Sequence, residues 1–360
     1  MSDSPGISSR KAEHIALCET DQVAFQRKTN LLEEVELVHD AMPEMALEEI
    51  DLSVEYAGKT LQAPLIIAAM TGGTEEAEAI NRDLATMAET YGIGFGFGSQ
   101  RPLLTEGIQT GYRVRDVAPN ALVLGNIGLV QAIQASTSAL AKMVDTCGAD
   151  ALVVHLNPAQ ELIQPGGDLD FRGGLQTLER LVKELHVPII VKETGCGLSR
   201  SVGTRILEVG VQYADCSGSG GTSWVGVETL RARNEQKSLG ERFWDWGIPT
   251  AASVAQLDGL GLAVCATGGV SNGLMVARAV ALGARCAGIA RTFLQARAQG
   301  GVNGLDTMVR QVLAEIRLAH LLAGARTPAE LQTKPLILGP GLLRWTPRGS
   351  RLWDRAHPSV

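Results

Sequence analysis

The sequence predicts a (β/α)8 barrel, and two features of its 360 residues carry this prediction. Eight short apolar runs follow one another from residue 61 onward, and segments of helix length separate most of them. This alternation is typical of parallel strands joined by helices. An open, doubly wound sheet is the structural alternative. It is less favoured because no GxGxxG motif follows the first run.

Each expected strand is a short apolar run, and most of these runs end in glycine or polar residues. The expected strands are residues 64–69, 93–98, 121–124, 151–154, 187–191, 211–216, 262–266 and 285–290. The expected helices are residues 75–91, 131–147, 171–185, 199–209 and 304–323. The insertion at 223–247 is too long for a plain loop, which predicts a lid over the site.

The barrel is expected to span residues 61–325, with an N-terminal arm at 1–60 and a C-terminal tail at 326–360. In the arm, a helix is expected to open near Arg10, Lys11 and His14. These basic groups favour either a solvated helix start or an arm that folds over an anionic ligand. The tail is expected to be partly ordered or to contact another subunit.

Composition narrows the possible functions. Hydrophobic residues make up 45% of the chain, which allows a large core, and the net charge of −7 argues against a nucleic-acid partner. No apolar run is long enough for a membrane span, and residues 1–10 lack a signal-peptide core. Six cysteines without CxxC spacing predict reduced thiols in a cytoplasmic protein. Cys196 is a possible catalytic thiol without a supporting signature.

The stretch from His155 to Glu161 is the centre of the expected site. Pro158 is expected to stop the fourth strand, which would place Gln160 and Glu161 on the following loop. Barrels build their active sites at this end of the strands. Taken alone, the stretch is equally consistent with a polar loop whose histidine satisfies a neighbour.

Glycine-rich turns after the last two strands predict a phosphate site. They are residues 268–273 and 288–291, and the second ends in Arg291, which can contact a phosphate with two hydrogen bonds. Ordinary tight turns are the alternative. Lys192 ends the fifth strand, where a buried ammonium needs a partner and could neutralise a reduced cofactor.

With these motifs the chain resembles the type 2, FMN-dependent isopentenyl diphosphate isomerases. The matching pieces extend from residue 10 to beyond residue 290, and as an ordered set they are highly specific. They are Arg10-Lys11 with His14, Met70-Thr71-Gly72-Gly73, Gly98-Ser99-Gln100-Arg101, His155-Leu156-Asn157 with Gln160-Glu161, Lys192-Glu193, Gly195-Cys196-Gly197, residues 220–224, residues 245–250 and Gly268-Gly269.

The resemblance implies a role for each matched position. The diphosphate substrate would be bound by Arg10, Lys11, His14, Ser99 and Arg101, with Trp224 beside the isoprenyl group. Mg²⁺ would be held by Glu161. The catalytic residues would be Gln160, with His155 and Asn157 in support, and Lys192. FMN would be bound by Ala69, Met70, Thr71, Gly72, Ser99, Asn126, Lys192, Ser217, Thr222, Gly268, Gly269, Ser271, Ala290 and Arg291.

One position departs from the family pattern. An arginine is expected after the Gly-Gly-apolar turn, and this chain has Ser271 there. One salt bridge to the FMN phosphate is then missing, unless Arg291 replaces it. The departure bears on FMN affinity more than on the reaction.

The implied reaction is a 1,3-allylic proton shift that interconverts isopentenyl and dimethylallyl diphosphate, with NADPH needed only to reduce FMN. A homo-oligomer, tetramer or octamer, is also implied. The alternative is an FMN-dependent oxidoreductase of the 2-hydroxy acid oxidase type, but the end of the seventh strand offers Thr267 and glycines instead of a histidine. A dehydrogenase with a cysteine nucleophile and a non-catalytic binding protein are weaker alternatives.

Overall fold

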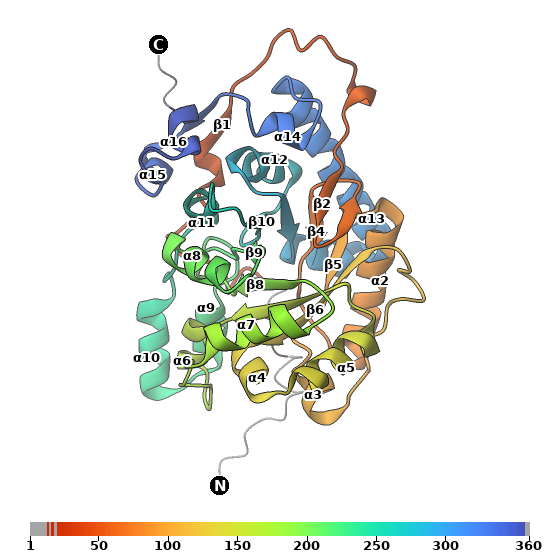
Figure 1. Ribbon diagram of the computed structural model, residues 1–360, viewed down its shortest axis with the longest axis vertical. Helices are drawn as coiled ribbons and strands as arrows, with labels where there is room; N and C mark the ends of the chain where they lie inside the picture. The colour runs from red at the N-terminus through yellow and green to blue at the C-terminus, as the bar shows by residue number, and fades with distance from the viewer. Residues whose placement is uncertain (1–12, 14–15, 18–19, 357–360) are drawn as a thin grey trace.

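The structure is a computed structural model that describes Glu13, residues 16–17 and residues 20–356. Eight parallel strands close into a barrel, and helices surround it (Figure 1). This confirms the predicted fold. The barrel strands, in order around the barrel, are β4 (Leu65–Ile67), β5 (Gly94–Gly96), β6 (Leu122–Gly128), β7 (Ala151–Leu156), β8 (Ile189–Glu193), β9 (Tyr213–Asp215), β10 (Ala263–Ala266) and β11 (Cys286–Ile289).

The N-terminal end of the barrel is closed by a hairpin of β2 (Val54–Tyr56) and β3 (Lys59–Leu61). Tyr56 and Leu61 are almost fully buried, and they pack with inward-facing strand residues such as Ile66 and Val153. Polar groups fasten the hairpin to the strands. We call this the closed end of the molecule.

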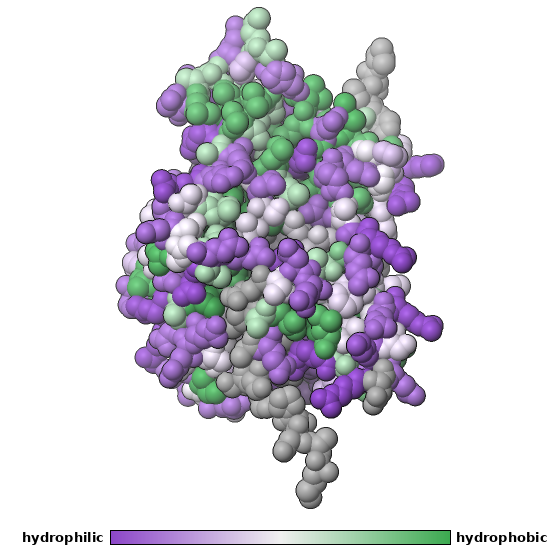
Figure 2. Space-filling model, turned by 180° about the vertical axis from the view of Figure 1, so that it is seen from behind, coloured by the Kyte–Doolittle hydropathy of each residue, from purple (hydrophilic) through white to green (hydrophobic). Residues whose placement is uncertain are grey.

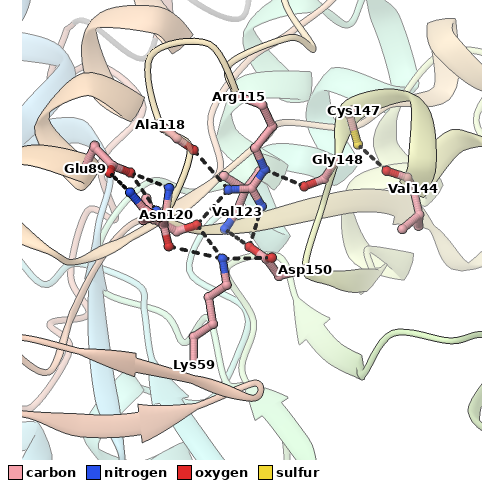
Figure 3. A network of polar contacts seen from close by, with 11 residues as sticks. Lys59, Glu89, Arg115, Ala118, Asn120, Val123, Val144, Cys147, Gly148 and Asp150 are labelled. Carbon is pink, nitrogen blue, oxygen red and sulfur yellow. Dashed lines mark hydrogen bonds and ion pairs between the residues drawn. The ribbon is translucent and has the colours of Figure 1, made fainter.

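A network of ion pairs holds the closed end (Figure 3). Asp150, just before β7, lies 2.5 Å from Arg115 and 2.9 Å from Lys59 of the hairpin. The same carboxylate accepts the backbone N–H of Val123 at 2.8 Å. Lys59 also donates to the backbone carbonyl of Asn120 at 3.1 Å. Hairpin, loop and two strands are therefore joined by one charged cluster.

Several helices begin or end at residues with a clear local signal. Thr74 accepts from the backbone N–H of Ala77 and caps the first long helix, which Gly92 ends in the left-handed conformation. The helices are α2 (Glu75–Tyr91), α3 (Arg101–Glu106), α4 (Leu129–Gln134), α5 (Thr137–Cys147), α6 (Pro158–Ile163), α7 (Gly174–Glu184), α8 (Arg200–Glu208), α9 (Trp224–Arg231), α10 (Asn234–Phe243), α11 (Thr250–Leu257), α12 (Gly273–Leu282), α13 (Arg291–Leu322), α14 (Pro328–Leu331), α15 (Pro340–Leu343) and α16 (Arg351–Ala356).

Two local predictions were wrong. The single helix expected over 131–147 is two helices, because Ser136 interrupts it and caps α5 by accepting from the N–H of Ala139. Gln160 and Glu161 lie on α6, not on a loop. Proline lacks an N–H, which the first turn of a helix does not need, so Pro158 starts this helix instead of only ending the strand.

Two longer segments contain more helix than the sequence predicted. The helix predicted over 304–323 is the second part of α13, which bends at Gly301 (φ 60°). The predicted lid at 223–247 is built mainly from α9 and α10, which pack on each other. The segment is therefore helical and not an irregular loop.

Two segments that are distant in the sequence pair outside the barrel. β1 (Val35–Leu37) pairs antiparallel with β12 (Leu336–Leu338). Two 3-10 helices, η1 (Leu32–Glu34) and η2 (Leu47–Glu49), flank β1. Figure 2 shows apolar side chains gathered at the upper end of the far face, and the exposed apolar residues next to β1 and at the end of α13 include Val38, Met42 and Leu322. In the part of the chain described, no helix is long and apolar enough to cross a membrane.

Candidate active site

A cavity of about 390 Å³ opens at the C-terminal ends of the barrel strands, which we call the open end. Residues at or just beyond the end of every barrel strand line it. The predicted site residues among them are Ala69, Met70, Thr71, Ser99, Arg101, Asn126, His155, Asn157, Gln160, Glu161, Lys192, Ser217, Thr222, Trp224, Gly268, Gly269, Ser271, Ala290 and Arg291. Arg10, Lys11 and His14 lie outside the described residues.

Gly72 does not line the cavity. A Cβ atom at this position would lie 2.2 Å from Cε1 of the Tyr112 ring. The Tyr112 hydroxyl donates to the carbonyl of Ser99 at 2.7 Å. Gly72 therefore makes room for a ring that positions the Ser99 loop, and its effect on the cavity is indirect.

One side of the cavity is built to hold an anion. Gly268 and Gly269 have φ values of 104° and 73°, and a Cβ on Gly268 would lie 2.1 Å from the carbonyl oxygen of Gly218. Ala290 gives no side-chain cap to α13, which leaves the first N–H groups of that helix available. Arg291 Nη1 is buried without a hydrogen-bond partner in the described chain. Free N–H groups and an unsatisfied guanidinium together favour a bound phosphate.

Ser271 lines the same side of the cavity, with its hydroxyl 3.5 Å from the sulfur of Met275. Arg291 lies opposite Asp21 at 3.7 Å, a loose contact with an exposed carboxylate. Among the described cavity residues, Arg101 and Arg291 are the arginines. Arg291 is thus the described guanidinium on the side where Ser271 replaces the expected arginine.

Lys192 is held at the floor of the cavity. Its ammonium donates to Asp215 Oδ2 at 2.8 Å and to Thr267 Oγ1 at 3.0 Å. The hydroxyl of Thr267 also donates to the other oxygen of Asp215. The lysine and aspartate side chains are each 12% exposed, so the pair is fixed and largely screened from water. Asp215 was missed, although it stands directly opposite Lys192 in the strand register.

His155 is neutral, and its tautomer follows from its partners. Asn126 donates through Nδ2 to the carbonyl of Phe97 at 3.0 Å, so its oxygen is the atom that accepts from His155 Nδ1 at 2.7 Å. Burial, aided by the charge of Lys192, lowers the pKa of His155 to about 4. His155 therefore adds no positive charge to the cavity near pH 7.

Gln160 is held between two neighbours. Its Nε2 donates to Glu228 Oε1 at 3.4 Å, and its Oε1 accepts from Asn157 Nδ2, also at 3.4 Å. Asn157 donates in addition to Glu161 Oε1 at 2.8 Å. The helix α6 carries Gln160 and Glu161, and α9 carries Glu228. Two segments that are distant in sequence thus form one polar wall.

Glu161 is the candidate metal ligand, and its side chain is mostly committed to protein donors. Its Oε2 accepts from the backbone N–H of Asp168 at 2.9 Å and from Gln164 Nε2 at 3.3 Å. In the residues described, no group of three metal-binding side chains occurs. One carboxylate suits Mg²⁺ only if a ligand's phosphate oxygens and water complete the coordination.

The N-terminal arm lies along the open end. The backbone N–H of Ser223 donates to Val23 at 2.7 Å, and that of Phe25 donates to Gly221 at 3.2 Å. Farther along, Asn30 Nδ2 donates to the carbonyl of Gly269 at 2.7 Å. The arm is thus attached to the loops that form the cavity.

Cys196 does not belong to the site. It is absent from the cavity wall, and burial raises the pKa of its thiol, which keeps it protonated. Its backbone N–H instead donates to the buried carboxyl of Glu193. Burial raises the pKa of Glu193 to about 8. The contacts of Cys196 itself are therefore structural, whereas its neighbours Thr194 and Gly195 line the cavity.

Other proteins resemble this chain in fold. Flavocytochrome b2 variants and mandelate oxidase variants are among the similar solved structures. One flavocytochrome b2 structure has a TM-score of 0.66 and 20% identity over 92% of this chain and 83% of the other. One mandelate oxidase structure has a TM-score of 0.61 and 17% identity over 89% and 92%. At this identity the likeness concerns the fold alone.

Sequence relatives are much closer. Proteins named isopentenyl-diphosphate delta-isomerase match from Methanothermobacter thermautotrophicus (42% identity, 92% of this chain and 93% of the relative), Thermococcus kodakarensis (43%, 91% and 91%) and Synechococcus sp. (44%, 93% and 97%). The family model of FMN-dependent dehydrogenases matches residues 6–160 and 165–338. The chain therefore belongs to the FMN-dependent dehydrogenase family and, within it, to the type 2 isopentenyl-diphosphate delta-isomerases.

Proposed function

We propose that the protein interconverts isopentenyl diphosphate and dimethylallyl diphosphate by a 1,3-allylic proton shift that depends on reduced FMN and Mg²⁺. The observation that carries the proposal is one cavity in which an anion-binding side lies near the polar wall of Gln160. A redox enzyme for 2-hydroxy acids has no evident need of that wall. The names of the sequence relatives support the same reaction.

The residues of the open end fit FMN. The turn of Gly268 and Gly269, the start of α13 and the unsatisfied Arg291 would hold its phosphate. Thr71, Asn126, Ser217 and Thr222 offer hydrogen-bonding groups, and Lys192 would neutralise negative charge on the ring. When bound and reduced, FMN supplies an acid–base group and an electron-rich ring face.

The diphosphate would bind at the outer part of the cavity. Ser99 and Arg101 line it, and Arg10, Lys11 and His14, which lie outside the described residues, would complete the diphosphate site. Glu161 would hold Mg²⁺, which would supply positive charge to balance the diphosphate. Because Glu161 is the one carboxylate among the described residues that line the cavity, this ion and the substrate would bind together.

The protein's own residues would then orient the alkene and limit the positive charge near the cation that forms on the substrate. The substrate's double bond is unactivated, so its protonation develops positive charge on a tertiary carbon. Neutral His155 adds no further positive charge to the cavity, and Gln160 would present a fixed amide to the alkene. Trp224 would shield the isoprenyl group from water.

NADPH as the first reductant, a tetramer or octamer and a cytoplasmic location remain part of the proposal. The test is an anaerobic incubation of the purified protein with FMN, Mg²⁺, a reductant and isopentenyl diphosphate, followed by NMR. Dimethylallyl diphosphate that forms without stoichiometric use of the reductant supports the isomerase. Bound flavin without isomerisation would contradict it and favour the 2-hydroxy acid oxidase alternative, tested with 2-hydroxy acids.

A further inference from the structure

Arg231 lies between the N-terminal arm and the polar wall of Gln160. Its Nε lies 2.8 Å from Glu13 Oε2, and its Nη1 lies 2.6 Å from Glu228 Oε2. The arginine side chain is 12% exposed, whereas that of Glu13 is 49% exposed. Glu13, Arg231 and Glu228 therefore form a line of charged side chains from the molecular surface to the polar wall of Gln160.

Glu228 needs this arginine. Its side chain is fully buried, and an ionised carboxylate in such a place requires a counter-charge. Arg231 provides one from the next turn of α9 through a planar guanidinium, which binds only in defined directions. Arg231 contacts Oε2 of Glu228, and Oε1 of the same carboxylate accepts from Gln160.

The orientation of the Gln160 amide depends on that acceptor. A terminal amide can rotate and exchange its oxygen and nitrogen. An acceptor on one side, Glu228, and a donor on the other, Asn157 Nδ2, favour a single orientation. If Glu228 turned away or took up a proton, this preference would be lost.

Glu13 belongs to the segment that is proposed to bind the diphosphate, because it stands between Lys11 and His14 in the sequence. We propose that Arg231 is a positioning residue that couples the seating of the arm on the diphosphate to the orientation of Gln160, through Glu13 and Glu228. The inference rests on the proposed function. Such coupling acts in both directions, so the alkene end also affects the arm.

A double-mutant cycle on turnover tests the coupling. Glu13→Gln, Arg231→Gln and the double variant are assayed anaerobically with reduced FMN. Arg231→Gln is expected to lower kcat about 30-fold and Glu13→Gln about 5-fold, within the range of measured pair interactions. Glu13→Gln should change kcat little further in the Arg231→Gln protein. Arg231→Lys should be more active than Arg231→Gln, because lysine keeps the positive charge. It should remain less active than the wild type, because lysine lacks the planar guanidinium.

The matched control is Arg233→Gln, an exposed arginine two positions away, which should behave as the wild type. FMN affinity and the thermal unfolding midpoint show whether each variant is folded. Since Glu13 is half exposed, Glu13→Gln gives a folded variant even if Arg231→Gln does not.

Additive effects on kcat, or a Glu13→Gln variant that changes KM alone, would overturn the inference. A wild-type protein without turnover would instead overturn the proposed function. In that case the same cycle is measured by calorimetry on the Kd of isopentenyl diphosphate for the FMN-loaded protein. Non-additive Kd values support the coupling, whereas additive values or no binding overturn it.

Discussion

The two ends of the barrel use charged groups in opposite ways. At the closed end, Asp150 meets two cations and a backbone N–H, so its charge is fully compensated by the protein (Figure 3). At the open end, Arg291 has a buried Nη1 without a partner in the described chain. The comparison indicates that the closed end contributes to stability, and that the open end keeps binding capacity for ligands.

A substitution in the polar wall of Gln160 distinguishes the roles of the two ends most clearly. Gln160→Asn shortens the side chain and breaks its contacts with Glu228 and Asn157. We expect kcat to fall about 100-fold, an effect typical of a lost catalytic contact. FMN binding and the free energy of unfolding should stay near wild-type values. Unchanged isomerisation would show that Gln160 has no part in the reaction.

The opposite pattern is expected at the closed end. Asp150→Asn leaves Arg115 and Lys59 without their shared carboxylate, and we expect the free energy of unfolding to fall by about 2 kcal/mol. Denaturant titration measures this change. Asp170→Asn is the control, because its ion pair with Arg172 is exposed. The comparison would fail if Asp150→Asn lowered kcat and left stability unchanged.

A pH effect should come from the open end. His155 takes a proton near pH 6.5 in the unfolded chain and only near pH 4 in the folded protein. Stability from this group is therefore complete above pH 6.5 and is lost as the pH falls toward 4, by roughly 1.4 kcal/mol per pH unit. The difference in the free energy of unfolding between the wild type and the His155→Gln variant, measured by denaturant titration at several pH values, isolates this slope. Parallel pH curves for the two proteins would contradict the neutral, buried histidine.

The smallest expected effect concerns Ser271. Ser271→Arg adds a second guanidinium beside the anion-binding turn, and we expect FMN to bind up to about tenfold more tightly. Fluorescence titration of FMN measures the affinity, and Ser271→Gln controls for side-chain size. Weaker binding by the arginine variant would place the FMN phosphate elsewhere.

Local patterns predicted most of the barrel and the cavity wall. Apolar runs identify parallel strands, and residues that follow them must gather at one end, so positions such as Asn126 and Lys192 could be predicted to meet. Helix ends were less predictable, because Pro158 can both stop a strand and start a helix.

Residues that depend on distant partners were missed. Glu228 and Arg231 lie in an insertion, and nothing in their own surroundings shows that α9 packs against α6. Gly72 was predicted from a family motif, but its structural role was not. A glycine is needed there because the ring of Tyr112, forty positions later, occupies the space of a Cβ atom. Asp215 could have been inferred, since Lys192 needs a buried counter-charge and the next strand carries one.

The most direct measurement is isomerisation in D₂O with a counted amount of reductant. The fully reduced, FMN-loaded protein is incubated anaerobically with Mg²⁺ and isopentenyl diphosphate, and NMR follows deuterium in both isomers. We predict many turnovers for each reduced flavin, with solvent deuterium in the dimethylallyl product. One product per reducing equivalent, or product without deuterium, would contradict a proton shift at the open end.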